Sequence, residues 1–197
     1  KGVSLRDADI VYRAADMLDE SAFESPGISD DCVSPYSDYW RAYGAYLERD
    51  YEEAVQFFEQ SEAGGFMDCM KYAELQVSFP LYYSHALQQL GDQRFEEKLK
   101  LVHERLDFFT ERGWGGSRLN LYNVALNLVE GNFGQANEGL LKLREQAIEP
   151  FGMIFAEPIF DEFYSNKILE PTLTLARQDF ENTRKRSEAQ HLVKFGL

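Results

Sequence analysis

The three histidines, His85, His103 and His191, are the residues with the widest range of chemistry, because imidazole can bind a metal or transfer a proton near neutral pH. A zinc site on a helix needs two histidines four residues apart, as in H-x-x-x-H or H-E-x-x-H. Neither spacing occurs in this sequence. The histidines therefore predict no metal site, and we interpret His85 and His103 as side chains of structural helices.

Cys32 and Cys69 are the two cysteines of the chain. They lack the C-x-x-C spacing of zinc and redox motifs, and two cysteines are too few for a disulfide scaffold. A single disulfide between them and two free thiols both remain open at this point.

Carboxylates gather at Glu157, Asp161 and Glu162, and the first two would share one face of a helix. Such a pair could act as general acid and base. Pro158 and acidic residues are, however, typical of a first helical turn, where they suit the fixed proline dihedral and the helix dipole. The glycine-rich run 113–116 lacks the lysine of a phosphate-binding loop, so we interpret it as a turn. The sequence predicts no catalytic residue, no cofactor and no enzyme.

A row of amide side chains supplies binding candidates instead. Asn120, Asn123, Asn127 and Glu130 are spaced by three, four and three residues, so they share one helix face. An asparagine amide both donates and accepts, and a row of amides can bind the backbone of an extended peptide. Arg118 nearby can bind a carboxylate through two parallel hydrogen bonds. A solvated helix face explains the same spacing, and both interpretations stand.

Tyrosines add to this set. Trp40, Tyr43 and Leu47 follow helical spacing and are expected in the core, whereas Tyr39 and Tyr46 fall on a neighbouring face. An exposed tyrosine there would anchor a partner, because its ring is large, rigid and polar at the tip. The candidate groove residues are therefore Arg118, Asn120, Asn123, Asn127, Tyr39 and Tyr46.

The elements that would position these residues are helices, since alternating β-type patterns are nearly absent. Prolines and glycines delimit the helical segments, and each proline is expected where a helix starts or stops. We expect helices over 4–21, 36–48, 51–63, 66–76, 81–90, 93–112, 117–130, 133–147, 158–166 and 171–188, with a loop over 22–34.

Three turns, near residues 50, 92 and 132, share a Gly, Asp or Asn followed by an aromatic residue. Their spacing of about 40 residues is typical of repeated helical hairpins. One hairpin cannot bury its apolar face alone, so each stacks on the next. The expected fold class is all-α, with stacked helical hairpins and flanking N- and C-terminal helices.

Residues 36–148 resemble the tetratricopeptide repeat (TPR). The residues that carry the resemblance are Trp40, Gly44, Tyr46, the string DYEEA over 50–54 and Phe58 in one repeat, Gly131, Asn132, Phe133 and Ala136 in another, and Gly91 and Asp92 in a degenerate one. The first repeat lacks the glycine before Asp50, so its turn is expected to be one residue tighter.

The run EPIFDEFY over 157–164, followed by a polar helix with Arg184, Lys185 and Arg186, is similar to the segment that closes TPR regions of bacterial signalling proteins. The resemblance implies a single TPR-like superhelical domain over 1–197. Its hairpins would lie at about 36–63, 81–112 and 117–148, with a closing segment over 157–188. It also implies the sensory or interaction part of a larger bacterial signalling or transcription-regulating protein.

Charge and hydropathy limit the partners. The chain has 34 Asp and Glu against 20 Lys and Arg, a net charge of −14, which argues against nucleic-acid binding. No apolar run approaches the roughly 20 residues of a membrane span. We expect a soluble segment, in a cytoplasmic or periplasmic part of a larger protein, that binds a protein or peptide without catalysis. A small-molecule-sensing domain and a homodimeric scaffold are the alternatives.

Overall fold

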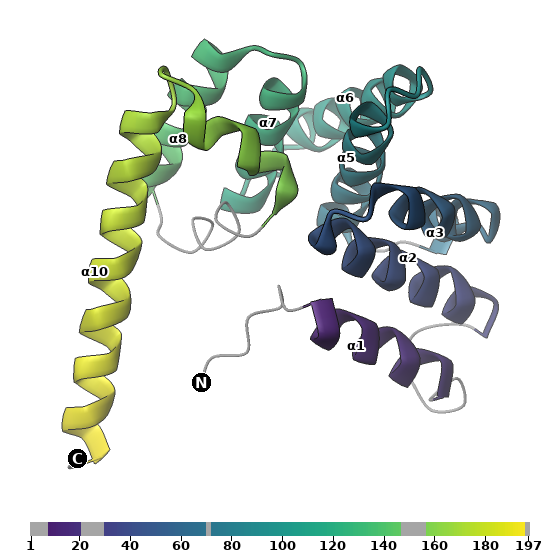
Figure 1. The fold of residues 1–197 in the computed structure, drawn as a ribbon, viewed down its shortest axis with the longest axis horizontal. Coiled ribbons are helices and arrows are strands. Elements are labelled where there is room, and N and C mark those ends of the chain that lie inside the picture. Colours follow the sequence, from purple (N-terminus) through teal and green to yellow (C-terminus); the bar gives the residue numbers. More distant parts are fainter. Residues whose placement is uncertain (1–7, 21–29, 70–71, 147–156, 196–197) are drawn as a thin grey trace. The chain divides into compact units, whose positions relative to one another are not determined.

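The computed structural model describes residues 8–20, 30–69, 72–146 and 157–195 of the 197-residue chain (Figure 1). These residues are almost entirely helical, and none of them forms a β-strand. The predicted all-α fold of stacked helical hairpins is confirmed.

The contacts divide the chain into two compact units, Lys1–Trp114 (unit 1) and Gly115–Leu197 (unit 2), and each is described by itself. Unit 1 contains α1 (Ala8–Glu20), α2 (Asp30–Glu48), α3 (Tyr51–Ala63), α4 (Phe66–Cys69), α5 (Ala73–Gln89) and α6 (Phe95–Glu111). Unit 2 contains α7 (Ser117–Val129), α8 (Phe133–Gln146), the 3-10 helix η1 (Pro158–Ser165) and α10 (Glu170–Phe195). The pairs α2–α3, α5–α6 and α7–α8 pack as the predicted hairpins.

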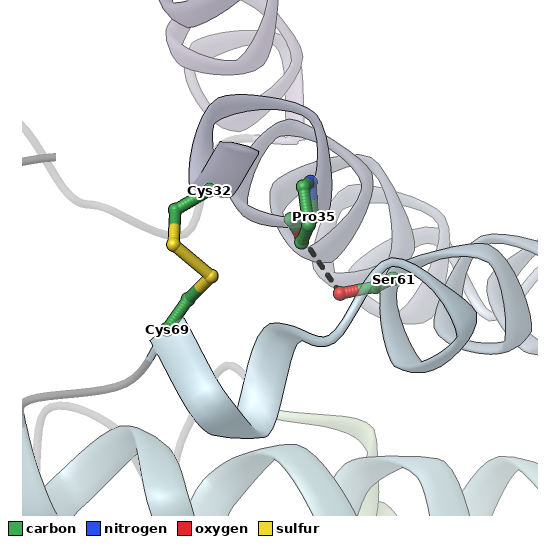
Figure 2. Close-up of a disulfide and its surroundings, with 4 residues drawn as sticks. All are labelled: Cys32, Pro35, Ser61 and Cys69. Carbon is green, nitrogen blue, oxygen red and sulfur yellow. Dashed lines mark hydrogen bonds between the residues drawn. A yellow bond between two sulfur atoms is a disulfide. The ribbon is translucent and has the colours of Figure 1, made fainter. Parts of the chain in front are cut away.

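Two prolines lie inside helices, contrary to the prediction. Pro35 lies within α2 and Pro80 within α5, so these helices begin earlier than expected, at Asp30 and Ala73. A proline removes one intrahelical hydrogen bond, but its carbonyl still accepts. The Pro35 carbonyl accepts a 2.7 Å hydrogen bond from the Ser61 hydroxyl (Figure 2). Both prolines are buried, and we attribute their tolerance within the helices to this tertiary packing.

The three hairpin turns have the same geometry. Arg49, Gly91 and Gly131 adopt left-handed conformations, with φ of 66°, 70° and 75°. In each turn the next residue donates its backbone N–H to the carbonyl five positions back, at 3.0, 3.0 and 2.8 Å. The expected tighter first turn is wrong, because Arg49 adopts the conformation that glycine supplies in the other two turns.

We expect Arg49→Gly to raise the free energy of unfolding by about 0.5–1 kcal/mol. A left-handed residue other than glycine costs about 1–2 kcal/mol, and the greater freedom of glycine in the unfolded chain offsets part of the gain. Urea unfolding followed by circular dichroism measures the change. The matched control is Gly91→Ala, whose Cβ would meet nothing within 4 Å and which should lower the stability instead. An equal or lower stability of Arg49→Gly would contradict the expectation.

The core of unit 1 is aromatic. Tyr39 lies 4.7 Å from Phe66 between ring centroids, and Tyr82 lies 5.3 Å from Tyr43 and 5.1 Å from Tyr46. All five side chains are buried. Because α2 contacts α1, α3, α4 and α5, more than one of its faces is covered.

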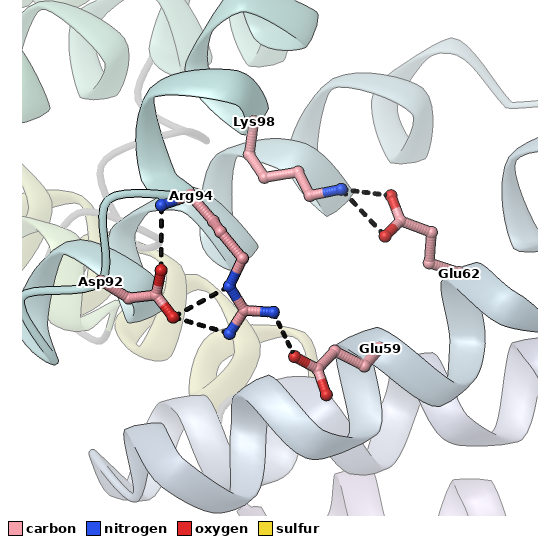
Figure 3. Close-up of polar contacts among 5 residues, drawn as sticks. All are labelled: Glu59, Glu62, Asp92, Arg94 and Lys98. Carbon is pink, nitrogen blue, oxygen red and sulfur yellow. Dashed lines mark hydrogen bonds and ion pairs between the residues drawn. The ribbon is translucent and has the colours of Figure 1, made fainter.

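Charged side chains join the hairpins α2–α3 and α5–α6 at their surface (Figure 3). Arg94 lies 2.7 Å from Glu59 and 2.6 Å from Asp92, and Lys98 lies 2.6 Å from Glu62. Arg94 and Lys98 are four residues apart, and Glu59 and Glu62 are three apart. Each spacing is about one helical turn, so each cation lies against one glutamate. Exposed pairs such as Arg94–Asp92 stabilise only weakly, whereas the Lys98 side chain is half-buried. Arg94–Glu59 and Lys98–Glu62 join residues of the two hairpins, whereas Arg94–Asp92 lies within one of them.

Cys32 and Cys69 form a disulfide, with Cα atoms 5.6 Å apart, which settles the alternative that the sequence left open (Figure 2). It joins the first turns of α2 to the end of α4. A four-residue helix has no stability of its own. The disulfide and the fully buried Phe66 ring therefore hold α4 against α2.

Candidate binding groove

An open groove with a cavity volume of about 560 Å³ lies between α7 and α8 in unit 2. Its walls carry polar side chains and its floor is apolar. The lining residues are Asn120, Asn123, Val124, Asn127, Gln135, Glu138, Gly139, Lys142 and Leu143.

One wall is the asparagine row of α7. The structure brings Asn120, Asn123 and Asn127 together along the groove, as their spacing predicted. The Asn127 side-chain amide donates a 2.8 Å hydrogen bond to the backbone carbonyl of Asn123. This bond occupies one side-chain N–H of Asn127 and leaves the side-chain carbonyl oxygen of Asn127 for a ligand. The wall therefore offers both donors and acceptors.

The other wall is a second polar row, which the sequence analysis missed. Gln135, Glu138 and Lys142 lie on α8 with the same spacing of three and four residues as the asparagines. All three side chains are exposed. The spacing of this row can be found in the sequence, but its three residues are of different types. The row on α7 is easier to recognise because it consists of three identical amides.

Gly139 lets the two walls approach each other. A Cβ atom built at Gly139 would lie 2.5 Å from Cγ2 of Val124, closer than any side chain tolerates. The helices α7 and α8 therefore meet at this level, and a larger residue would push them apart. The antiparallel direction of the hairpin then places Asn120 level with Lys142, and Asn127 level with Gln135.

The other predicted groove residues lie elsewhere. Arg118 is exposed in the first turn of α7 and does not line the groove. Tyr39 and Tyr46 are 2% and 0% exposed in unit 1, so their predicted exposure is wrong. The prediction assumed that a single face of α2 was covered, whereas four helices contact it. Tyr46 instead places its hydroxyl 2.9 Å from Nδ1 of His85.

The remaining chemistry-bearing residues lie in different places. His85 is buried in α5, and His103 is exposed on α6, while the side chain of His191 lies outside the described residues. Glu157 is buried beside η1 and Asp161 is exposed, and the side chain of Glu162 is also outside the described part. Among the described residues, no three His, Cys, Asp or Glu side chains come together as a metal site.

Burial lowers the pKa of His85 to about 4, because a charged imidazole would lose its hydration there. The ring is 4% exposed, and its Nε2 lies 3.2 Å from the side-chain nitrogen of Gln89. His85 is thus a neutral, hydrogen-bonded core residue rather than a proton donor at a surface.

Comparisons with protein families, with curated proteins and with solved structures found no match to this chain. Within the described ranges, the helices are too short or too polar for any of them to cross a bilayer. The fold and the groove define the class: an all-α protein of helical hairpins, one of which carries an open polar groove.

Proposed function

We propose that this chain is a non-catalytic module that binds an extended peptide or protein segment in the groove between α7 and α8. The observation that carries the proposal is the pair of polar rows that face each other across an apolar floor. Backbone amides of a bound segment need donors and acceptors at regular intervals, and the asparagine row supplies them.

The dimensions of the groove suit such a ligand. Asn120 and Asn127 are seven residues apart on α7, which corresponds to about 10 Å along the helix axis. An extended chain rises about 3.3 Å per residue, so the row spans about three peptide units. A polar small molecule is the second candidate, because a volume of about 560 Å³ also falls in the usual range of small-ligand sites.

Replacing Asn123 and Asn127 by alanine should weaken peptide binding about tenfold, because each lost hydrogen bond is worth about 0.5–1.5 kcal/mol. Nine-residue peptides selected for binding from a fluorescein-labelled random library are titrated by fluorescence polarisation. The control is Asn182→Ala, an exposed asparagine on α10 of the same unit that does not line the groove.

Circular dichroism establishes that each variant keeps its helices. Equal affinity of the wild-type protein and the folded double variant would rule out the groove. If no peptide is selected while a polar small molecule saturates the groove, the second candidate replaces the first.

The wider role is part of the same proposal. We assign the module to the sensory or interaction part of a larger bacterial signalling or regulatory protein, on the strength of the TPR-like sequence pattern. The repeated turns at Arg49, Gly91 and Gly131 support a repeat architecture. The full reading frame tests the assignment, since it identifies any domain attached to this one.

The disulfide also supports a proposal about the cellular compartment of the protein. Bonds of this kind form and persist in oxidising environments and are rare in the cytosol. Because Cys32 and Cys69 are paired, we place the chain in an oxidising compartment, the periplasmic of the two alternatives. Thiol labelling of the protein in its native cells tests this, and two reactive thiols would contradict it.

A further inference from the structure

Glu138 and Lys142 lie four residues apart on α8 and both line the groove, with exposed side chains. A glutamate four residues before a lysine usually forms an ion pair on a helix. In this structure no ion pair within 4.0 Å joins these two described side chains, and neither bonds another described side chain. The groove therefore presents one anionic and one cationic group that are both available to a ligand.

The spacing of these two charges matches an extended peptide. Four residues of an α-helix rise about 6 Å. Alternate side chains of an extended chain point to the same side and lie about 6.6 Å apart. A segment whose backbone lies along the asparagine row would therefore direct the side chains of residues i and i+2 toward Glu138 and Lys142.

The charge of unit 2 makes this selection effective. Unit 1 has 23 Asp and Glu against 11 Lys and Arg, whereas unit 2 has 11 against 9. The acidic excess of the chain therefore belongs to unit 1. Because unit 2 is nearly neutral, its own charges do not impose a field of one sign on the groove, and specificity depends on how its individual charges pair with the ligand.

We propose that the groove selects peptide segments that carry a basic and an acidic side chain two residues apart, with Glu138 and Lys142 as the specificity-determining residues. The inference rests on the proposed function and names the ligand class of that groove. Glu138 binds the basic side chain and Lys142 the acidic one, while Asn120 and Asn123 bind the backbone between them and Asn127 binds the backbone beyond Glu138.

The test uses three capped peptides of equal length that contain Lys-Ala-Glu, Lys-Ala-Lys or Glu-Ala-Glu at their centre, with the full chain at low salt. We expect the first to bind the wild-type protein three- to tenfold more tightly than the other two. Glu138→Lys should shift the preference to Glu-Ala-Glu, and Lys142→Glu should shift it to Lys-Ala-Lys. Glu145→Lys, an exposed α8 residue outside the groove, is the matched charge control and should keep the wild-type ranking.

The outcomes separate the two proposals. If the three peptides bind equally, or if Glu138→Lys and Lys142→Glu keep the wild-type ranking, the charge assignment is overturned and the peptide groove stands. If none of these or the library peptides binds, both proposals fall. Two results together support the assignment. The affinity differences among the three peptides disappear in 0.5 M salt, because exposed charges are screened at that ionic strength, and each variant prefers the peptide predicted for it.

Discussion

Replacing both Cys32 and Cys69 by serine is expected to lower the free energy of unfolding of unit 1 by about 4 kcal/mol. The two residues are 37 positions apart, and a crosslink over a loop of that length removes about this much conformational freedom from the unfolded chain. The loss would be a large part of the about 5–15 kcal/mol that stabilises a typical domain.

The native contacts around the disulfide explain why the variant should weaken unit 1 rather than rearrange it. Phe66 in α4 is fully buried, and the Ser61 hydroxyl holds the Pro35 carbonyl at 2.7 Å (Figure 2). Without the crosslink, the Phe66 ring still holds α4 against Tyr36 and Tyr39 of α2, and the Ser61 bond still joins α3 to α2. The main effect of the substitution is therefore on the unfolded state.

Hydrogen exchange with mass spectrometry measures the change by segment. Peptides from α2 and α3 should lose protection in the double variant, while peptides from α7 and α8 serve as the internal reference. A dithiol reductant should destabilise the wild-type protein and leave the double variant unchanged. Equal protection of α2 and α3 in both proteins would contradict the expected role of the disulfide.

Acidification should destabilise unit 1 through His85, by about 2 kcal/mol between pH 7.5 and pH 5. The folded-state pKa of His85 is lowered to about 4, against 6.5 for the free side chain, because of burial. Well above pH 6.5 the imidazole is neutral in both states and does not affect the stability. As the pH falls toward 4, the unfolded state binds a proton that the folded state cannot, so stability is lost.

The contacts of His85 indicate the variant that isolates this effect. Nδ1 lies 2.9 Å from the Tyr46 hydroxyl, and the rings of Tyr46 and Tyr51 lie edge-on at 5.7 and 6.0 Å. Glutamine keeps a neutral hydrogen-bonding group at this position and has no proton to gain. His85→Gln should therefore lower stability at pH 7.5 and show a flatter pH dependence.

Urea unfolding of the wild-type protein and of His85→Gln at several pH values gives the measurement. Titration of the carboxylates contributes equally to both proteins, so it cancels in the difference between the two curves. The difference should change by about 2 kcal/mol between pH 7.5 and pH 5. Parallel curves would show that His85 is protonated as easily in the folded state as in the unfolded one.

The helical hairpins were predictable because their signals are local. Glycine and the Asp or Asn after it specify the turn at 91 and 131, and each turn forms the same hydrogen bond. Arg49 shows the limit of this rule, since a residue that is unfavourable in the left-handed region forms the same turn. The helices on either side require the reversal and impose it on Arg49.

The starts of α2 and α5 were mispredicted for a related reason. A proline penalty is a local quantity, whereas the hydrogen bond from Ser61 to Pro35 joins residues 26 positions apart. Pro80 is buried and continues a helix whose neighbours Val77 and Phe79 are fully buried. Apolar burial of this size exceeds the cost of one missing helical hydrogen bond.

The candidate site was half predictable. The spacing of Asn120, Asn123 and Asn127 placed them on one face, and they line one wall of the groove. Whether that face is open to solvent or lies opposite a second polar wall depends on the neighbouring helix α8. The close approach of Gly139 to Val124 brings α8 near enough to form that wall. No periodicity within α7 contains this information.

The sequence by itself determined the all-α class, the hairpin turns and the grouping of amides on α7, because these follow from backbone preferences and helical periodicity over a few residues. The tertiary structure alone decided the pairing of Cys32 with Cys69, the burial of Tyr39 and Tyr46, and the polar row of α8 opposite the asparagines. Each of these depends on which helices contact one another, and such contacts join residues that are distant in the chain.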